Sequence, residues 1–195
     1  MSPLEAIAVL LGLANIVLLV RRSIWNYPFG IATVSLYGLI FFRERLYSDA
    51  LLQGLFLALN IYGWANWVRA SDTADDAEGR VPVQRMPGAG VGLCALGAAG
   101  ATLAWGTIMH RYTDAAMPYW DASVAMMSVL AQYLLARRYI DNWAWWIAVD
   151  LVAVPLYWAK GLHLTAGLYV VYLLLSTTGL FSWISAQRRL EPAAA

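Results

Sequence analysis

The sequence contains few of the residues on which enzymes usually rely. Its single cysteine, Cys94, excludes a disulfide within the chain. The only histidines, His110 and His163, have no partner at metal-ligand spacing, and a metal site needs three or four converging ligands. A phosphate-binding G-x-x-x-x-G-K-[ST] loop is also absent, which argues against ATP hydrolysis. We therefore expect no metal and no cofactor.

Charge is also scarce, and it is unevenly placed. Charged residues make up 13% of the chain and hydrophobic residues 61%, against about 25% and roughly 45–50% in soluble domains. About twenty apolar residues cross a hydrocarbon core of roughly 30 Å. Seven such runs occur, with the charges almost entirely between them: 3–20, 26–43, 48–68, 88–109, 118–136, 143–159 and 164–185. This pattern predicts an all-α polytopic membrane protein with seven transmembrane helices.

The basic residues indicate an orientation in the membrane. With the N-terminus outside, nine arginines fall on the inner side and four basic residues on the outer side. This bias predicts N-out and C-in by the positive-inside rule. The first residues lack the basic region and the cleavage site of a signal peptide, so we expect the first apolar run to be retained.

The chain matches itself at a gapless offset of 116 residues. The informative matches are polar or bulky: Arg21-Arg22 with Arg137-Arg138, Asn26 with Asn142, Gly63 with Gly179, and Trp67 with Trp183. An even number of crossings separates the copies, so they should have the same orientation. Internal repeats in a membrane bundle are typical of transporters whose substrate site lies between the halves.

The repeat predicts five segments. Residues 1–69 form the first three-helix repeat, 70–87 a solvated cytoplasmic connector, and 88–109 an unpaired linker helix. Residues 118–186 form the second three-helix repeat and 187–195 a cytoplasmic tail. The linker helix is rich in glycine and alanine, which allow close packing in lipid. It could pack within the chain, which we favour, or against another subunit in a homo-oligomer.

Polar side chains deep in a membrane are costly unless they face one another or a cavity. At helical spacing, Gln53, Asn60 and Trp64 share one face of the helix expected at 48–68. Gln132 and Asp150 lie well inside later spans. These groups could be interhelical hydrogen-bonding partners or could line a substrate cavity. Most tryptophans fit an interfacial belt, and Asn26 and Asn142 fit helix N-caps.

A cavity lined by aromatic rings, amides and hydroxyls suits a planar, polar solute that is uncharged or singly cationic. Aromatic faces attract cations by roughly 0.5–2 kcal/mol. No Arg or Lys lies within a span to hold a phosphate dianion, whose unpaired burial is prohibitive.

Longer motifs resemble a known family. The runs Trp25–Ile31 (WNYPFGI) and Asn60–Trp67 (NIYGWANW), with Asp141-Asn142-Trp143 and Lys160-Gly161-Leu162 in the second half, are similar to the PnuC vitamin transporters. The resemblance covers nearly the whole chain outside the connector and the linker helix. It implies a 3+1+3 bundle related to the SWEET transporters, in a bacterial inner membrane.

The resemblance also implies a function. It suggests facilitated uptake of nicotinamide riboside for NAD biosynthesis, with a separate cytoplasmic kinase trapping the substrate. Thiamine and riboflavin are carried by related members and stay alternatives. No nucleic-acid partner is expected.

Carried over by position, the expected substrate-binding residues are Gln53, Asn60, Trp64, Gln132, Trp146, Asp150 and Tyr157. The amides would bind ribose hydroxyls or the carboxamide, and the aromatics would stack on a ring. Asp150 would orient the amides, balance a cationic ring, or stay protonated in a medium of low dielectric constant.

Two other classes of function compete with transport. An intramembrane enzyme could use Asp150 or Asp121 with His163 or Lys160, but no nucleophile and base share a helix face. A sensor or scaffold that does not transport is disfavoured by the polar residues that share helix faces deep in the expected spans.

Overall fold

The computed structural model describes residues 3–43, 45, 47–71 and 81–190. This part of the chain forms seven α-helices, and the expected all-α class and the number of helices are confirmed. Their bounds are α1 (Pro3–Val20), α2 (Asn26–Arg43), α3 (Tyr47–Ser71), α4 (Gly88–Tyr112), α5 (Pro118–Ala136), α6 (Asn142–Ala159) and α7 (His163–Leu190). Most of these bounds lie within a few residues of the apolar runs, because polar connectors end each run.

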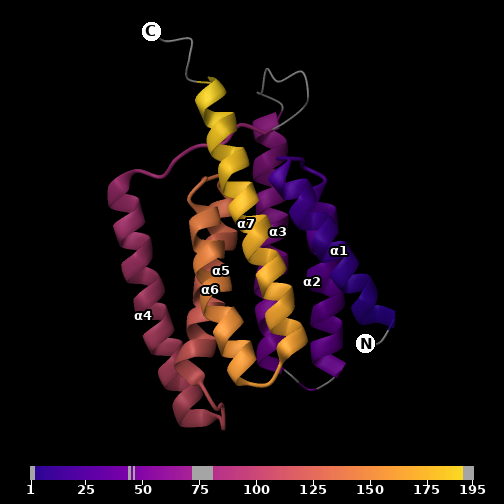
Figure 1. Cartoon of the computed structure of the whole chain (residues 1–195), viewed down its shortest axis with the longest axis vertical. Coiled ribbons are helices and arrows are strands. Elements are labelled where there is room, and N and C mark those ends of the chain that lie inside the picture. The colour runs from indigo at the N-terminus through magenta and orange to yellow at the C-terminus, as the bar shows by residue number, and fades with distance from the viewer. Residues whose placement is uncertain (1–2, 44, 46, 72–80, 191–195) are drawn as a thin grey trace.

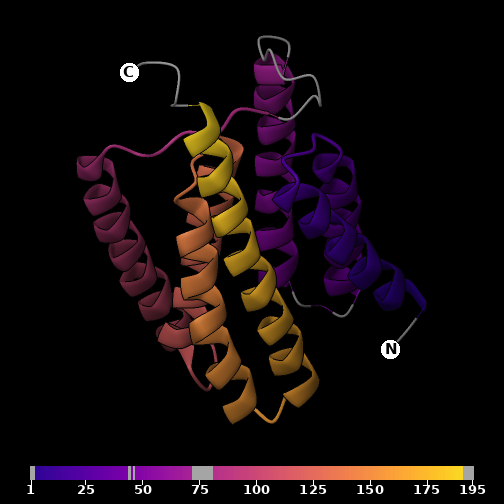
Figure 2. The ribbon, with the colours of Figure 1, turned by 45° about the horizontal axis from the view of Figure 1, so that its top comes forward.

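Six of the helices form a closed ring. The ring follows the order α1, α2, α3, α5, α6 and α7, and α7 packs back against α1. In the described residues α4 contacts only α5, and it lies at the edge of the bundle (Figures 1 and 2). Figure 1 also shows that α1 begins at the lower end of the view and α7 ends at the upper end. The linker helix therefore packs within the chain, although its other face carries no contact.

The outer surface of the bundle is apolar. Gly88–Tyr112 and His163–Arg188 are the described segments both long and apolar enough to cross a membrane by length and composition alone. Only 6% of the apolar stretch in the first of these is buried, so it is not the core helix of a soluble bundle. The described apolar part of α1, Ile7–Val20, is shorter than these two segments. An exposed apolar surface of this extent marks a contact with lipid or protein.

Two pairs of turns repeat the same backbone conformation 116 residues apart. Arg22 and Arg138, which follow α1 and α5, have φ values of 58° and 63°. Arg45 and Gly161, which precede α3 and α7, have φ values of 61° and 75°. Left-handed residues commonly end helices, because they turn the chain so that the following N–H groups bond to the last carbonyls of the helix, as after α1 and α5.

The expected N-cap role of Asn26 and Asn142 is wrong in detail. Each side chain donates a hydrogen bond from Nδ2 instead of accepting one from the helix: Asn26 to the Ser23 carbonyl (2.7 Å) and Asn142 to the Tyr139 carbonyl (2.6 Å). These amides reinforce the preceding turns, whose carbonyls also accept the backbone N–H groups of the same asparagines.

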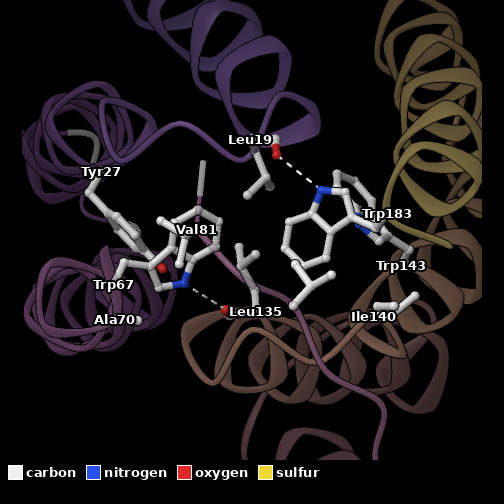
Figure 3. Close-up of a cluster of buried hydrophobic side chains, with 10 residues drawn as sticks. Leu19, Tyr27, Trp67, Ala70, Val81, Leu135, Ile140, Trp143 and Trp183 are labelled. Atoms are coloured by element: carbon white, nitrogen blue, oxygen red, sulfur yellow. Dashed lines mark hydrogen bonds between the residues drawn. The ribbon is translucent and has the colours of Figure 1, made fainter. Parts of the chain in front are cut away.

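A cluster of buried side chains lies at the end of the ring where α2 and α6 begin (Figure 3). We call it the aromatic layer, after its members Tyr27, Trp67, Trp143 and Trp183. Trp67 donates a hydrogen bond from Nε1 to the Leu135 carbonyl at 3.2 Å, and Trp183 donates one to the Leu19 carbonyl at 3.3 Å. Both donor positions and both acceptor positions are 116 residues apart. Each indole therefore ties its own three helices to the first helix of the other three.

Two glycines make room for this layer. A Cβ atom on Gly63 would lie 2.6 Å from Tyr27 Oη, and one on Gly179 would lie 2.5 Å from the Trp143 ring. The same rings make T-shaped contacts, Tyr27 with Trp67 and Trp143 with Trp183. Only a residue without a side chain lets these helices approach so closely.

The end of the connector packs on the bundle, which corrects the expected solvated stretch. Val81 is 0% exposed and Val83 is also buried, because alternate residues of this extended segment face the aromatic layer. The backbone N–H of Gln84 donates to the Arg138 carbonyl (3.1 Å), and the backbone N–H of Met86 donates to Asp141 Oδ2 (2.8 Å). Residues 72–80 of the expected connector lie outside the described residues.

Candidate functional site

A cavity of about 270 Å³ lies inside the ring of six helices. All six helices contribute to its wall, and α4 contributes nothing among the described residues. The wall comprises Gly12, Asn15, Ile16, Leu19, Asn26, Gly30, Thr33, Val34, Gln53, Phe56 and Asn60 from the first copy of the repeat. From the second copy it comprises Ser128, Gln132, Leu135, Trp143, Trp146, Val149, Asp150, Tyr169, Tyr172 and Ser176. Polar groups from both copies thus face one enclosed space.

Most wall positions are equivalent between the copies at the offset of 116 residues. The pairs are Gly12 with Ser128, Ile16 with Gln132, Leu19 with Leu135, Gly30 with Trp146, Thr33 with Val149, Val34 with Asp150, Gln53 with Tyr169, Phe56 with Tyr172, and Asn60 with Ser176. The same helix faces of both copies therefore line the cavity, although the side chains differ in every pair except Leu19 with Leu135.

Five of the seven expected site residues line the cavity together: Gln53, Asn60, Gln132, Trp146 and Asp150. Trp64 does not; its side chain is 40% exposed on α3, one turn beyond Asn60. Tyr157 lies behind the wall, where its ring stacks on Tyr169 with centroids 5.1 Å apart. It supports a lining residue from a second layer.

Other residues that line the cavity are absent from the expected substrate-binding set. Four of them offer hydroxyl groups: Tyr169, Tyr172, Ser176 and Ser128. Asn15 was missed. It is the sole amide in an otherwise apolar first helix, and that isolation is the signal that could have identified it.

Close packing of α1, α2 and α3 brings two amides together at Gly30. A Cβ atom at this position would lie 2.7 Å from Asn60 Oδ1 and 2.9 Å from Asn15 Nδ2. Asn15 donates to the Asn26 carbonyl at 2.6 Å, and Asn60 donates to the Phe56 carbonyl at 2.8 Å. These bonds fix the orientation of both side chains, so Asn60 Oδ1 is held at the cavity wall as an acceptor.

Two glutamine side chains have no hydrogen-bond partner within the described residues. Gln53 on α3 and Gln132 on α5 both line the cavity, and Gln132 is buried. An amide offers two donors and an acceptor, and leaving these unmatched in a buried place is costly. A polar solute in the cavity would satisfy them.

Asp150 is the only acidic residue in the wall, and no Arg, Lys or His lines the cavity in the described chain. The Asp150 side chain is 2% exposed, and Ser176 Oγ donates a hydrogen bond to its Oδ2 at 3.2 Å. Asp121, the other acidic residue of the enzyme hypothesis, is paired with Lys160 at 2.6 Å. This pair lies near the end of the bundle that is opposite the aromatic layer. The site thus has a single carboxyl without a basic neighbour.

An apolar exterior around a central cavity lined by amides, hydroxyls, aromatic rings and one carboxyl is typical of a polytopic membrane transporter. The sequence profile of the nicotinamide mononucleotide transporter family matches residues 2–185. The chain belongs to this family.

Similar proteins have been characterised. The chain is 28% identical to the nicotinamide riboside transporter PnuC of Escherichia coli K12, over 96% of this chain and 87% of that protein. It is 33% identical to the riboflavin/roseoflavin transporter RibM of Streptomyces davaonensis, over 92% and 84% respectively. A crystal structure of the vitamin B3 transporter PnuC superposes with a TM-score of 0.77 at 26% identity, covering 95% of this chain and 82% of that one.

Proposed function

We propose that this protein is a facilitative transporter that takes up nicotinamide riboside, an NAD precursor, across a bacterial inner membrane. Family membership and the two relatives described above support transport of a vitamin-sized solute. The observation that carries the proposal is the central cavity, whose wall joins amides, aromatic rings and one carboxyl from six helices.

The architecture is two parallel three-helix repeats joined by a linker helix, a 3+1+3 bundle. The paired hydrogen bonds of Trp67 and Trp183 support it, as do the equivalent positions around the cavity. The repeats comprise residues 1–69 and 118–186, with the linker helix at 88–109. Rocking of the two repeats about the cavity would expose it to each side in turn.

We place the N-terminus outside and the C-terminus inside, because this orientation puts nine arginines on the cytoplasmic side. In this orientation the aromatic layer and the connector end cover the cytoplasmic side of the cavity. The Lys160–Asp121 ion pair then lies toward the outer side.

Riboside is favoured over the phosphorylated mononucleotide. The volume of about 270 Å³ lies just below the range of about 300–1,000 Å³ that is typical of sites for drug-sized ligands. A phosphate dianion would meet no basic side chain and would lie near Asp150. Burial of an unpaired charge is strongly unfavourable.

We assign direct contact to Gln53, Asn60, Gln132, Trp146 and Asp150. The three amides would bind the ribose hydroxyls and the carboxamide, and Trp146 would form a stacking face. Tyr157 supports this wall through Tyr169, and Trp64 stays outside it. A cytoplasmic kinase would phosphorylate the riboside and so prevent its return.

Riboflavin is the second candidate, because RibM is the relative with 33% identity. Thiamine stays a third on family resemblance. An enzyme is disfavoured, since the similar proteins are named as transporters.

A binding screen tests the proposal. Purified protein is titrated with nicotinamide riboside, its mononucleotide, thiamine and riboflavin by calorimetry. We expect the riboside to bind most tightly and the mononucleotide not to bind. If riboflavin binds most tightly, riboflavin is the substrate instead of the riboside. Binding of none of the four would refute the proposal.

A further inference from the structure

The two walls of the cavity differ in chemistry although their positions are equivalent. Asp150 in the second copy corresponds to Val34 in the first, and Trp146 corresponds to Gly30. The carboxyl group and both indole rings of the wall thus occur only on the second copy. A symmetric cavity would present the same groups to both ends of a solute, and this one does not.

Two further pairs follow this division, whereas Ile16, which corresponds to Gln132, does not. Gln53 on α3 corresponds to Tyr169 on α7, and Asn60 corresponds to Ser176. The first copy therefore offers carboxamides where the second offers a phenol and a hydroxyl. Amides in this arrangement suit a group with several hydroxyls, whereas aromatic faces beside a carboxylate suit a flat cation.

We propose that the cavity holds its solute in one fixed orientation. A cationic aromatic ring lies against the second-copy wall of Asp150, Trp146 and Tyr169, and the hydroxylated part lies against Gln53 and Asn60. Asp150 is then the residue that selects a positively charged ring. This inference rests on the proposed function, and it adds the direction of binding and the charge requirement.

The surroundings of Asp150 carry the argument. Its carboxyl is almost entirely buried and receives one hydrogen bond, from Ser176. No basic side chain lines the cavity in the described residues, so the protein supplies no counter-charge. A buried charge without a partner is unfavourable. A cationic ring would favour the ionised carboxylate and pair with it, whereas an uncharged ring of the same shape offers the carboxyl no such partner.

Nicotinamide riboside and its reduced dihydropyridine form provide a matched pair of probes. They carry the same ribose and carboxamide, but the reduced ring is uncharged. We expect the wild-type protein to bind the cationic form at least about tenfold more tightly, because only that form pairs with the buried carboxyl. Equal affinity of the wild-type protein for the two forms would overturn the assignment without any variant.

The variant Asp150→Asn locates the source of this preference. We expect it to weaken binding of the cationic form by about tenfold or more and to leave the reduced form within about twofold of wild type. Asp121→Asn makes the same chemical change outside the cavity, and we expect it to keep the wild-type preference. Equal weakening of both forms by Asp150→Asn would indicate a structural role instead.

These measurements distinguish a failure of the charge assignment at Asp150 from a failure of the proposed transport function. If the wild-type protein transports both forms but does not distinguish them, the charge assignment fails and the transport function stands. If neither form binds or crosses, the proposed function fails and the assignment fails with it.

Discussion

Trp67 and Trp183, 116 residues apart, each donate an indole hydrogen bond across the bundle to the end of a helix in the opposite copy. The acceptors, the carbonyls of Leu135 and Leu19, are also 116 residues apart (Figure 3). The two bonds form one reciprocal pair, and they close the aromatic layer between the copies. This relationship is the local basis for treating the chain as two equivalent halves.

Replacing either tryptophan should destabilise the fold to a similar degree. Trp67→Phe and Trp183→Phe each remove one indole hydrogen bond from a carbonyl that keeps its backbone donor, which costs about 0.5–1.5 kcal/mol. Thermal unfolding in detergent measures the change, with the exposed Trp25→Phe as the control. Wild-type stability in both variants would show that the reciprocal bonds contribute nothing.

The glycines under the aromatic layer should not tolerate a methyl group. Gly179→Ala would place Cβ about 2.5 Å from the Trp143 ring, and such overpacking costs about 1–3 kcal/mol. Gly97→Ala on α4 is the matched control, since a Cβ there meets nothing within 4 Å. Size-exclusion profiles and melting temperatures compare the two. If Gly179→Ala is as stable as Gly97→Ala, the helices do not approach as described.

The two glutamines should affect binding more than stability. Gln132→Ala and Gln53→Ala remove side chains that have no partner within the described protein, so the melting temperature should be nearly unchanged. Each lost hydrogen bond to the solute should weaken riboside binding by about threefold to tenfold, from roughly 0.5–1.5 kcal/mol. Calorimetry and thermal unfolding of the same preparations check both parts. A large loss of stability would make these residues structural.

Trp64 provides a test of the cavity boundary. The sequence pattern assigns it to the site, whereas the structure leaves it 40% exposed and outside the wall. We expect Trp64→Ala to bind the riboside within about twofold of wild type, because the lost surface is not at the cavity. An effect as large as that of Gln132→Ala would extend the site beyond the described wall.

The orientation can be tested with fusions at the C-terminus. Because the larger share of arginines marks the cytoplasmic side, a green fluorescent protein fusion should fluoresce and an alkaline phosphatase fusion should be inactive in cells. An active alkaline phosphatase fusion together with a non-fluorescent green fluorescent protein fusion would place the C-terminus outside the cell membrane instead.

The sequence anticipates the helices well because each span is bounded by charged or turn-forming residues. It also assigns Trp67 and Trp183 to equivalent positions, but as part of an interfacial belt, whereas the structure buries both indoles between the helices. The buried valines of the connector were missed, because a two-residue alternation within a polar stretch gives too weak a signal. The direction in which Asn15 faces depends on the packing of α1 against α2, which a sequence does not contain.

The extent of the site along each helix is the other part that the sequence leaves open. Gln53, Asn60 and Trp64 follow one helical stripe, but each turn advances about 5.4 Å along the axis. Trp64 is therefore beyond the depth of the cavity, although its spacing matches. Tyr157 shows the same limit on α6, where it packs behind Tyr169 instead of facing the solute.

Uptake into proteoliposomes tests the central claim most directly. Liposomes containing the purified protein are supplied with radiolabelled nicotinamide riboside or its mononucleotide, with protein-free liposomes as the control. We predict that the riboside equilibrates with the interior without ATP or an ion gradient and that the mononucleotide stays outside. Exclusion of the riboside, or equal entry of both compounds, would contradict the account.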